Sequence, residues 1–325
     1  MANSHLPNSH PDVTPDWQDI GYARTSFDEA IALKPIDGQR GHYSGFAPRD
    51  WCTPHDRGHC LHGGYIAALL IAGSRTYFRA YHGDLNQPDP IQMHLQYLQL
   101  TPPGVFHVRF TDIKLSKRLS TIQAELVSSD PVSLAPNSLA LFTMGDLNNN
   151  TGISMKLPPI PTPDREHDCA RWTNAFFYHI NPPTSAIRYY NPKDGDSLMW
   201  SPSRGRNARD QWGKLDSGDN FRLEHLGLMA DLIPAIHMNY QESALKAVLN
   251  YEYPTISMDF DFRADPAGRK EWILNRTKMH KLQNGRFDMH VQMIDDDGDL
   301  IATIRHSCLV FEHKRGQKNK VKSSL

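Results

Sequence analysis

The stretch GGYIAALLIAGSRTYFRAY, residues 63–81, is apolar and helix-like, and segments with a two-residue period follow it. In the first of these, IQMHLQYLQL at 91–100, Met93, Leu95 and Tyr97 alternate with polar residues and share one face of a strand. Further strand-like segments, separated by Pro-Pro-Gly, Lys-Arg and Asp-Pro turns, lie at 104–115, 120–129 and 138–145. The pattern predicts one helix followed by four strands.

The same order returns in the second half of the chain. Residues 223–237, LEHLGLMADLIPAIH, are helix-like, and residues 255–262, TISMDFDF, alternate apolar with polar side chains. Further strand-like segments, with an Asp-Gly hairpin turn in the tip IDDDGDL, lie at 271–280, 286–298 and 300–312. An offset of roughly 160 residues is too long for a solenoid repeat. The sequence therefore predicts two copies of one small α+β domain.

Changes in composition give the predicted domain boundaries. They are a disordered lead at 1–24, domains at 25–146 and 221–313 with a connecting segment at 147–220 between them, and a basic tail at 314–325. The connecting segment is rich in Pro, Asn, Asp and Gly, with one predicted helix near 171–180 and one predicted strand at 186–191. We expect it to cover the two domains and not to form a third.

Composition narrows the class of partner. Of the 325 residues, 39% are hydrophobic and 22% charged, as in ordinary globular proteins. The net charge of −1 gives no reason to expect nucleic acid or an anionic membrane as partner, and a small neutral or carrier-linked substrate fits better. The longest apolar run, residues 65–73, is far shorter than the roughly 20 residues that cross a bilayer, so we expect no membrane span. The cysteines, without a secretory signal, indicate reduced intracellular thiols: Cys52, Cys60, Cys169 and Cys308.

The residues Ser323, Ser324 and Leu325 follow a lysine-rich segment. They are an imperfect version of the Ser-Lys-Leu peroxisomal address. We expect a peroxisomal location, with a solvated tail on a cytoplasmic protein as the alternative.

Five motifs occur in the same order and spacing as in a known family. They are HGGYIAALL at 62–70, LGLMAD at 226–231, SMD at 257–259, Trp272 with Gly285 and Arg286, and DGDLIATIRHSCLV at 297–310. Over residues 25–313 the chain resembles the double-hotdog acyl-CoA thioesterases, in particular the fungal thioesterase-like branch, which is similar to the bacterial type II enzymes. The resemblance implies an α+β double hotdog, in which two tandem antiparallel sheets each wrap around a long helix. It also implies an acyl-CoA substrate and no metal or redox cofactor, with CoA present only as part of the substrate.

Side chains of the kinds that bind metals gather before the first helix: Cys52, His55, His59, Cys60 and His62. A structural zinc site takes four ligands, usually as two pairs at recurring spacing. The second pair is missing here, so we predict polar loop residues and no metal site.

Gly63 and Gly64 begin the first predicted helix. A helix start leaves unpaired N–H groups with partial positive charge, and glycine lets a ligand approach them. Such groups stabilise the oxyanion that forms from a thioester carbonyl, and the resemblance implies that this helix start faces the acyl thioester. Close helix packing is the alternative. His62 caps the helix or contacts substrate, and Tyr65 completes the predicted substrate-binding group.

The resemblance also supplies a catalytic set. Bacterial members combine an acid in the second helix, a hydroxyl residue on the next strand and a glutamine near the end of the last strand. These positions match Asp231, Ser257 and His306, so the third residue type is changed. Asp231 also stands out by itself, because it flanks the apolar face of its helix, where desolvation raises a carboxyl pKa and suits a general base. A surface acid turned toward water is the alternative.

Ser257 depends on the resemblance alone. Alternation groups it with Thr255, Asp259 and Asp261 on the solvent-facing side of its strand. Asp259 matches a family aspartate beside the site, and we expect it to be structural.

His306 leaves three mechanisms open, because histidine carries a proton near pH 7 and glutamine does not. Asp231 activates water that Ser257 and His306 position, or the three form a serine-histidine-acid set in which Ser257 attacks the thioester, or hydrolysis has been lost. Arg118 and Arg286 lie at equivalent points of the two halves, where they contact a nucleotide phosphate or brace the sheet.

The expected function is hydrolysis of an acyl-CoA to the free acid and CoA. The alternative is a thioesterase-like protein without hydrolase activity that binds or cyclises an acyl or polyketide intermediate in a specialised biosynthetic pathway. The sequence leaves open the acyl chain and the assembly into a homo-oligomer.

Overall fold

The structure is a computed structural model. It describes residues 25–55, 58–128, 135–149, 151–172, 181–193, 205–232, 236, 251–266 and 268–312. The predicted lead, the basic tail with Ser323–Leu325 and most of the predicted helix near 171–180 lie outside the described residues.

In the first half, a short and a long helix are joined by small strands, and a run of long strands follows. The elements are α1 (Phe27–Ala30), β1 (Lys34–Pro35), β2 (His42–Ala47), β3 (Cys52–His55), β4 (Gly58–Leu61), α2 (Gly63–His82), β5 (Asp89–Tyr97), β6 (Gly104–Lys114), β7 (Ser120–Ser128) and β8 (Ser138–Gly145). The prediction of one helix followed by four strands is confirmed by α2 and β5 to β8. The predicted loop before α2 is instead the hairpin β3–β4.

The second half repeats this order. Its elements are β9 (Cys169–Trp172), β10 (Ile187–Pro192), β11 (Ala208–Leu215), α4 (Leu223–Asp231), β12 (Tyr251–Glu252), β13 (Thr255–Phe262), β14 (Ile273–Lys278), β15 (Leu282–Gln283), β16 (Arg286–Asp295), β17 (Leu300–Leu309) and β18 (Phe311–Glu312). The predicted helix and the strands after it are confirmed, and β13 has the predicted bounds. Helix α4 ends at Asp231, and most of the predicted helix beyond it lies outside the described residues.

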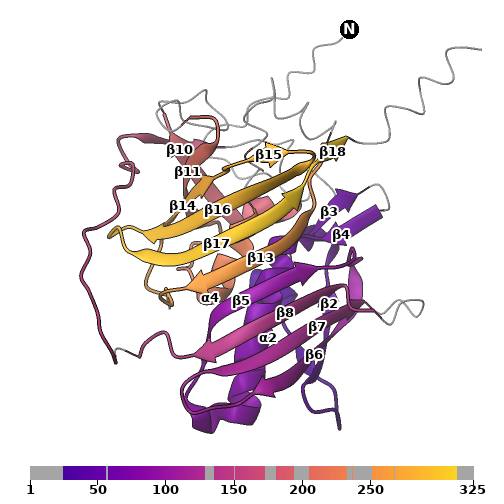
Figure 1. The fold of residues 1–325 in the computed structure, drawn as a ribbon. Coiled ribbons are helices and arrows are strands. Elements are labelled where there is room, and N and C mark those ends of the chain that lie inside the picture. The colour runs from indigo at the N-terminus through magenta and orange to yellow at the C-terminus, as the bar shows by residue number, and fades with distance from the viewer. Residues whose placement is uncertain are drawn as a thin grey trace, which may run out of the picture.

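The two tandem antiparallel sheets that the sequence predicted join edge to edge into one continuous sheet. The strand order is β1-β2-β6-β7-β8-β5-β13-β17-β16-β14-β11-β10-β9, with β15 paired to β16. The halves meet where β5 pairs antiparallel with β13, with Gln96 opposite Ser257 and Gln92 opposite Asp261. This pairing satisfies the backbone groups that two free edges would leave exposed. Figure 1 shows helices α2 and α4 together on one face of this sheet.

The predicted connecting segment contributes three strands to the sheet, of which only β10 was predicted. Strand β11 pairs with β14 just as β2 pairs with β6 in the first half. The sequence pattern did not predict β11, because Arg209, Asp210 and Gln211 are buried polar residues that break the apolar alternation. Asp210 accepts two hydrogen bonds from Arg276 on β14, at 3.0 and 2.9 Å. This pairing offsets the free energy cost of burying the carboxylate.

Helices α2 and α4 touch through glycine. A Cβ atom on Gly227 would lie 2.9 Å from the Ala68 nitrogen, and one on Gly64 would lie 2.5 Å from the Leu228 carbonyl oxygen. The helices therefore approach to a distance that only glycine allows. This contact brings the first turn of α2 to the last turn of α4. Among the described helices, none combines the length and hydrophobicity that a membrane crossing needs.

Candidate active site

Asp231 is the last residue of α4 and lies against the start of α2. Its side chain is 15% exposed, and its Oδ2 accepts a hydrogen bond of 3.0 Å from the Gly64 N–H. A Cβ atom on Gly63 would lie 2.5 Å from the same oxygen, so a side chain at this position would displace the carboxylate. The structure thus brings together Asp231, Gly63 and Gly64 from opposite halves of the chain.

The environment of Asp231 tunes its ionisation. Burial raises the pKa of Asp231 to about 7, although hydrogen bonds from the Gly64 N–H and the Thr255 hydroxyl favour the carboxylate and oppose that rise. A carboxyl group with this pKa changes its charge near neutral pH. Such a group can accept a proton from water and return it to a leaving group.

Two buried histidines flank Asp231. His62 is the N-cap of α2 and accepts a hydrogen bond of 3.1 Å from the Gly64 N–H, and its Nδ1 lies 3.7 Å from Asp231 Oδ2. His306 Nδ1 lies 3.9 Å from Asp231 Oδ1. Burial lowers the pKa of each histidine to about 4, so both rings are neutral at pH 7. The structure therefore places both predicted histidines at Asp231, as uncharged neighbours.

Ser257 does not join this group. Strand β13 has a bulge between Thr255 and Ser257, so Thr255 pairs with buried Cys308 while Ser257 pairs with exposed Ser307. The bulge turns Thr255 to the inner face of the sheet and leaves Ser257 on the outer face. Simple alternation had put both residues on one face and was wrong for Thr255. The hydroxyl that hydrogen-bonds Asp231 belongs to Thr255.

The sequence did not identify two further side chains at the site. The Tyr97 hydroxyl donates a hydrogen bond of 2.7 Å to the Gly63 carbonyl oxygen, and burial raises the pKa of Tyr97 well above its usual range. Alternation had placed Tyr97 on the apolar face of its strand, where a phenol needs a partner, and that was the available signal. Cys308 Sγ lies 3.8 Å from Thr255 Oγ1, and burial raises the pKa of this thiol to about 12, so it stays protonated.

The remaining predicted site residues lie away from Asp231. Tyr65 is fully buried and donates a hydrogen bond of 2.6 Å to the Ala30 carbonyl oxygen, so its place is in the core. Arg118 is exposed in the turn before β7, and Arg286 is exposed at the start of β16. These arginines do occupy equivalent points of the two halves, as predicted. Their contact with a nucleotide stays a prediction.

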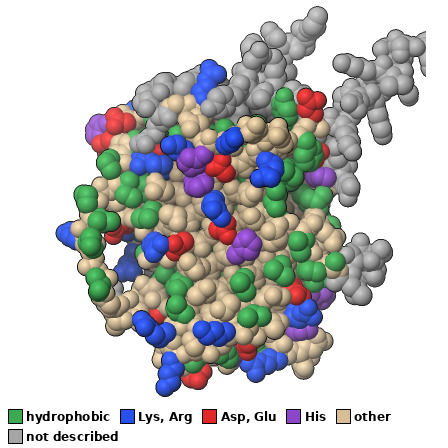
Figure 2. Space-filling view, in the orientation of Figure 1, with side chains coloured by type: hydrophobic (Ala, Val, Ile, Leu, Met, Phe, Trp, Pro, Cys, Tyr) green, Lys and Arg blue, Asp and Glu red, His purple; other side chains and the backbone are tan. Residues whose placement is uncertain are grey.

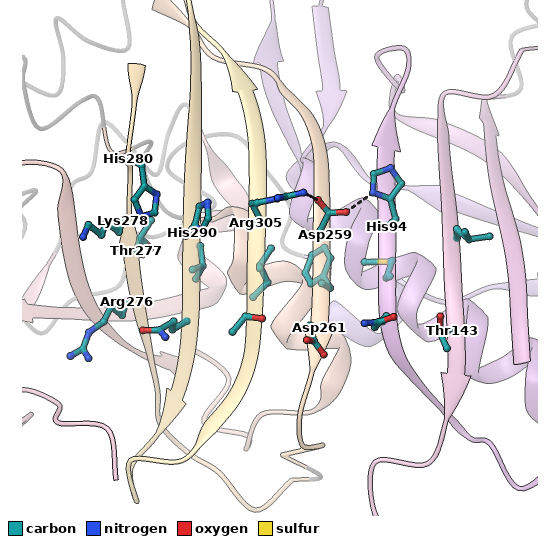
Figure 3. Close-up of a pocket in the computed structure, with 18 of the residues that line it drawn as sticks. His94, Thr143, Asp259, Asp261, Arg276, Thr277, Lys278, His280, His290 and Arg305 are labelled. Carbon is teal, nitrogen blue, oxygen red and sulfur yellow. Dashed lines mark hydrogen bonds and ion pairs between the residues drawn. The ribbon is translucent and has the colours of Figure 1, made fainter. Parts of the chain in front are cut away.

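Asp259 lies on the outer face of the sheet, in a groove of about 1140 Å³ lined by both polar and apolar side chains. It interacts with His94 Nδ1 at 2.6 Å and with Arg305 at 3.2 Å, as Figure 3 shows. Burial alone raises the pKa of Asp259, but these two partners outweigh it and hold the pKa below its usual value. Asp231 is not among the residues that line this groove. Asp259 is therefore a bracing residue between β5, β13 and β17.

The cysteines and histidines before α2 are spread over the β3–β4 hairpin. Cys60 contacts Thr53, His59 contacts Arg49, and His55 lies 3.7 Å from Glu252. Burial raises the pKa of Cys52 to about 12 and also raises that of Cys60, so both are neutral thiols. Within the described part of the chain, the groups with metal-ligand geometry lie elsewhere.

Both halves of the chain match one known family. The acyl-CoA thioesterase N-terminal domain matches residues 48–145, and the acyl-CoA thioesterase C-terminal domain matches residues 155–310. The chain belongs to the double-hotdog acyl-CoA thioesterase family. The family match spans α2, α4 and the strands that cover them, so it includes Asp231 and its neighbours.

Individual relatives agree with this family. The chain is 24% identical over 318 residues to the thioesterase-like protein TwmA of Talaromyces wortmannii, covering 83% of this chain and 90% of that protein. A putative thioesterase II from Thermobifida fusca has a similar fold, with a TM-score of 0.66, 17% identity and coverage of 90% and 100% of the two chains. The acyl-CoA thioesterase II TesB2 of Mycobacterium marinum gives a TM-score of 0.64 at 13% identity, covering 89% of this chain and all of that one. These structures support the double-hotdog fold that the sequence predicted.

Proposed function

We propose that the protein hydrolyses the thioester of an acyl-CoA to the free acid and CoA, with Asp231 as general base. The observation that carries the proposal is a desolvated carboxyl group with a pKa of about 7, held against the N-terminus of α2. The family supports thioester chemistry, and this carboxyl group has the ionisation that a base and acid working at neutral pH requires.

The proposed reaction uses water as the nucleophile. Asp231 removes a proton from water while the water oxygen attacks the thioester carbon, and the carbonyl oxygen becomes an oxyanion. The Gly64 N–H already donates to Asp231, whereas Gly63, the first residue of α2, has an N–H without an acceptor inside the helix. We assign the oxyanion to the Gly63 N–H and the positive end of the helix dipole. The carbon–sulfur bond then breaks, and the Asp231 carboxyl returns its proton to the sulfur of CoA.

The neighbours of Asp231 hold it in place in this scheme. Thr255 and the Gly64 N–H fix the carboxylate by hydrogen bonds. His62 and His306 are neutral and line the site without competing for the proton at pH 7. Of the mechanisms left open by the sequence, activation of water fits better than attack by Ser257, because Ser257 lies on the outer face of β13.

Release of free CoA from short, medium, long and aromatic acyl-CoAs, followed with a thiol reagent, tests the proposal. Since the base must be ionised, kcat/KM should rise with pH through about 7 and level off above it, as the pKa of Asp231 requires. No turnover of any substrate by folded protein, or a rate that falls between about pH 6 and pH 8, would contradict the proposal.

The two hydroxyl residues of β13 give a second test. Thr255→Val removes a hydrogen bond that favours the Asp231 carboxylate, so we expect kcat/KM to fall about 10-fold or more and the midpoint of the pH profile to move upward. Thr255→Ser keeps the hydroxyl and should stay within about 3-fold of the wild type. Ser257→Ala should also stay within that range. A larger loss in Ser257→Ala than in Thr255→Val would restore Ser257 as the nucleophile.

A second function is favoured by one observation, the buried neutral histidine at position 306. It stands where bacterial relatives, as the resemblance implies, carry glutamine, and the related protein TwmA is named thioesterase-like. In this alternative the same site binds or cyclises an acyl or polyketide intermediate without hydrolysis. Binding of an acyl-CoA measured by calorimetry, without release of CoA, would favour it.

A further inference from the structure

The outer groove contains a row of charged side chains that crosses both halves of the sheet. His94, Asp259, Arg305, His290 and Lys278 stand opposite one another on β5, β13, β17, β16 and β14. Figure 3 shows these residues along the groove, and Figure 2 shows basic, acidic and histidine side chains gathered on this face. At the β14–β16 end the row meets His280, which also lines the groove.

His280, Asp288 and His290 converge at this end. Asp288 Oδ2 lies 2.8 Å from His280 Nδ1 and 3.4 Å from His290 Nε2. The two imidazole rings are 4.4 Å apart, and one ligand atom from each of the three residues lies within 4.8 Å of the others. Ligand atoms around a zinc ion, each about 2.0–2.2 Å from the metal, have separations in this range.

The backbone holds the carboxylate in position. Asp288 accepts hydrogen bonds from the N–H groups of His280, at 3.3 Å, and Lys281, at 2.9 Å. The chain returns from Lys281 to Asp288 through a tight turn at Asn284 and Gly285, whose φ angles are 52° and 70°. Both histidine side chains remain about half exposed, at 49% and 48%. The carboxylate is therefore held beside both imidazoles, and the group is open to ions from solvent.

We propose that His280, Asp288 and His290 form a binding site for a divalent transition-metal ion such as Zn²⁺. Two imidazole nitrogens and one carboxylate oxygen are a ligand set that suits zinc, and three protein ligands leave a fourth position for water. When the ion binds, His280 Nδ1 and the Asp288 carboxylate each bond to it and no longer contact each other. Because Nδ1 is then a ligand, His280 carries its proton on Nε2. The ion clamps the hairpin of β14 and β16.

The charged neighbours of the site affect its affinity for a cation. Lys278 and Arg305 flank His290 in register and oppose a cation, but Arg305 is neutralised by its ion pair with Asp259. The other group with metal-ligand geometry in the described residues, Asp295 to Asp297, differs because the Lys270 ammonium already contacts all three carboxylates. The site at His280 contains no such internal cation. It is independent of Asp231 and of the proposed thioesterase reaction.

Titration of the full-length protein with ZnCl₂ by calorimetry tests the site, and visible absorption of bound Co²⁺ reports its ligands. We expect His280→Ala and His290→Ala to lose one equivalent of metal or to bind it at least about 10-fold more weakly. The matched control is His94→Ala, since His94 forms a similar pair with Asp259, at 2.6 Å in the same groove, but belongs to no group of three metal-ligand side chains among the described residues. Zn²⁺ should raise the Tm of the wild type and of His94→Ala more than that of His290→Ala.

The chain has 17 histidines, so zinc binding by the wild type alone does not identify the ligands. The comparison between variants does. Circular dichroism of each variant checks that it is folded. Equal zinc stoichiometry and affinity in the wild type and the His280→Ala/His290→Ala double variant would overturn the proposal. Asp231→Asn should bind the metal as the wild type does, which separates this test from that of catalysis.

Discussion

Asp231→Asn is expected to lower kcat/KM for thioester hydrolysis by about 10²–10⁴-fold, the usual contribution of a general base. The amide has nearly the same shape and still offers an oxygen to the Gly64 N–H, which now donates to Asp231 Oδ2 at 3.0 Å. It cannot accept a proton from water. Release of CoA under saturating and limiting substrate, compared with the wild type, measures the effect. Retention of more than about one tenth of the activity would exclude Asp231 as the base.

The same substitution should leave the protein more stable at alkaline pH. The pKa of Asp231 is about 7 in the folded protein and near 3.8 in an unfolded chain, so the folded state holds this proton more tightly. Stability therefore falls as pH rises from about 4 to about 7, and above that range the buried charge destabilises the fold. We expect Asp231→Asn to raise the free energy of unfolding by roughly 1–3 kcal/mol near pH 8, with little gain near pH 4. Urea unfolding at both pH values checks the sign, and a loss near pH 8 would contradict it.

Arg75→Met is expected to lower the free energy of unfolding by about 3–5 kcal/mol, because it removes the positive charge that buried carboxylates contact. Arg75 lies on α2, and its guanidinium contacts Asp89, Glu224 and Asp265, each at 3.1 Å. Asp89 belongs to the first half of the chain and the other two to the second half. The guanidinium therefore joins the halves on the helix side of the sheet. Urea denaturation near neutral pH measures the loss.

Arg79→Met is the matched control for this prediction. Arg79 lies one turn further along α2 and, unlike the partly buried Arg75, is exposed to solvent. Its replacement should change the free energy of unfolding by no more than about 0.5 kcal/mol. Equal losses in the two variants would show that the helix, and not the ion-pair network, is responsible.

Much of the fold was accessible from periodicity. The change from a helix-like run at 63–81 to alternating segments predicted α2 and β5 to β8, and the same change after residue 222 predicted α4 and the strands that follow it. Strand β11 was missed because its buried polar residues interact with partners that are distant in the chain, such as Arg276. A pattern of hydrophobicity records burial of apolar side chains and does not detect a buried ion pair.

The candidate site was predicted in part. Asp231 was identified both from the resemblance and from its place beside an apolar helix face, and the structure gives it the raised pKa that this position predicts. Ser257 was chosen from the resemblance alone, and alternation, which assumes a regular strand, placed Thr255 on the solvent-facing side with it. The bulge in β13 adds one residue, so Thr255 and Ser257 lie on opposite faces of the sheet. Tyr97 was assigned to the core, since its contact with the Gly63 carbonyl depends on how β5 lies over α2.

The sequence by itself determined α2, α4 and the long strands that follow each helix, their order in two repeats and the family to which the chain belongs. These properties depend on residues close together in the chain, whose side-chain spacing selects a helix or a strand. Only the tertiary structure decided that the sheets join at β5 and β13, and that Gly64 meets a carboxylate 167 residues away. Contacts of this kind depend on the packing of whole elements against one another. For that reason the pKa of Asp231, which arises from its burial, could be given as a direction from the sequence and as a value only from the fold.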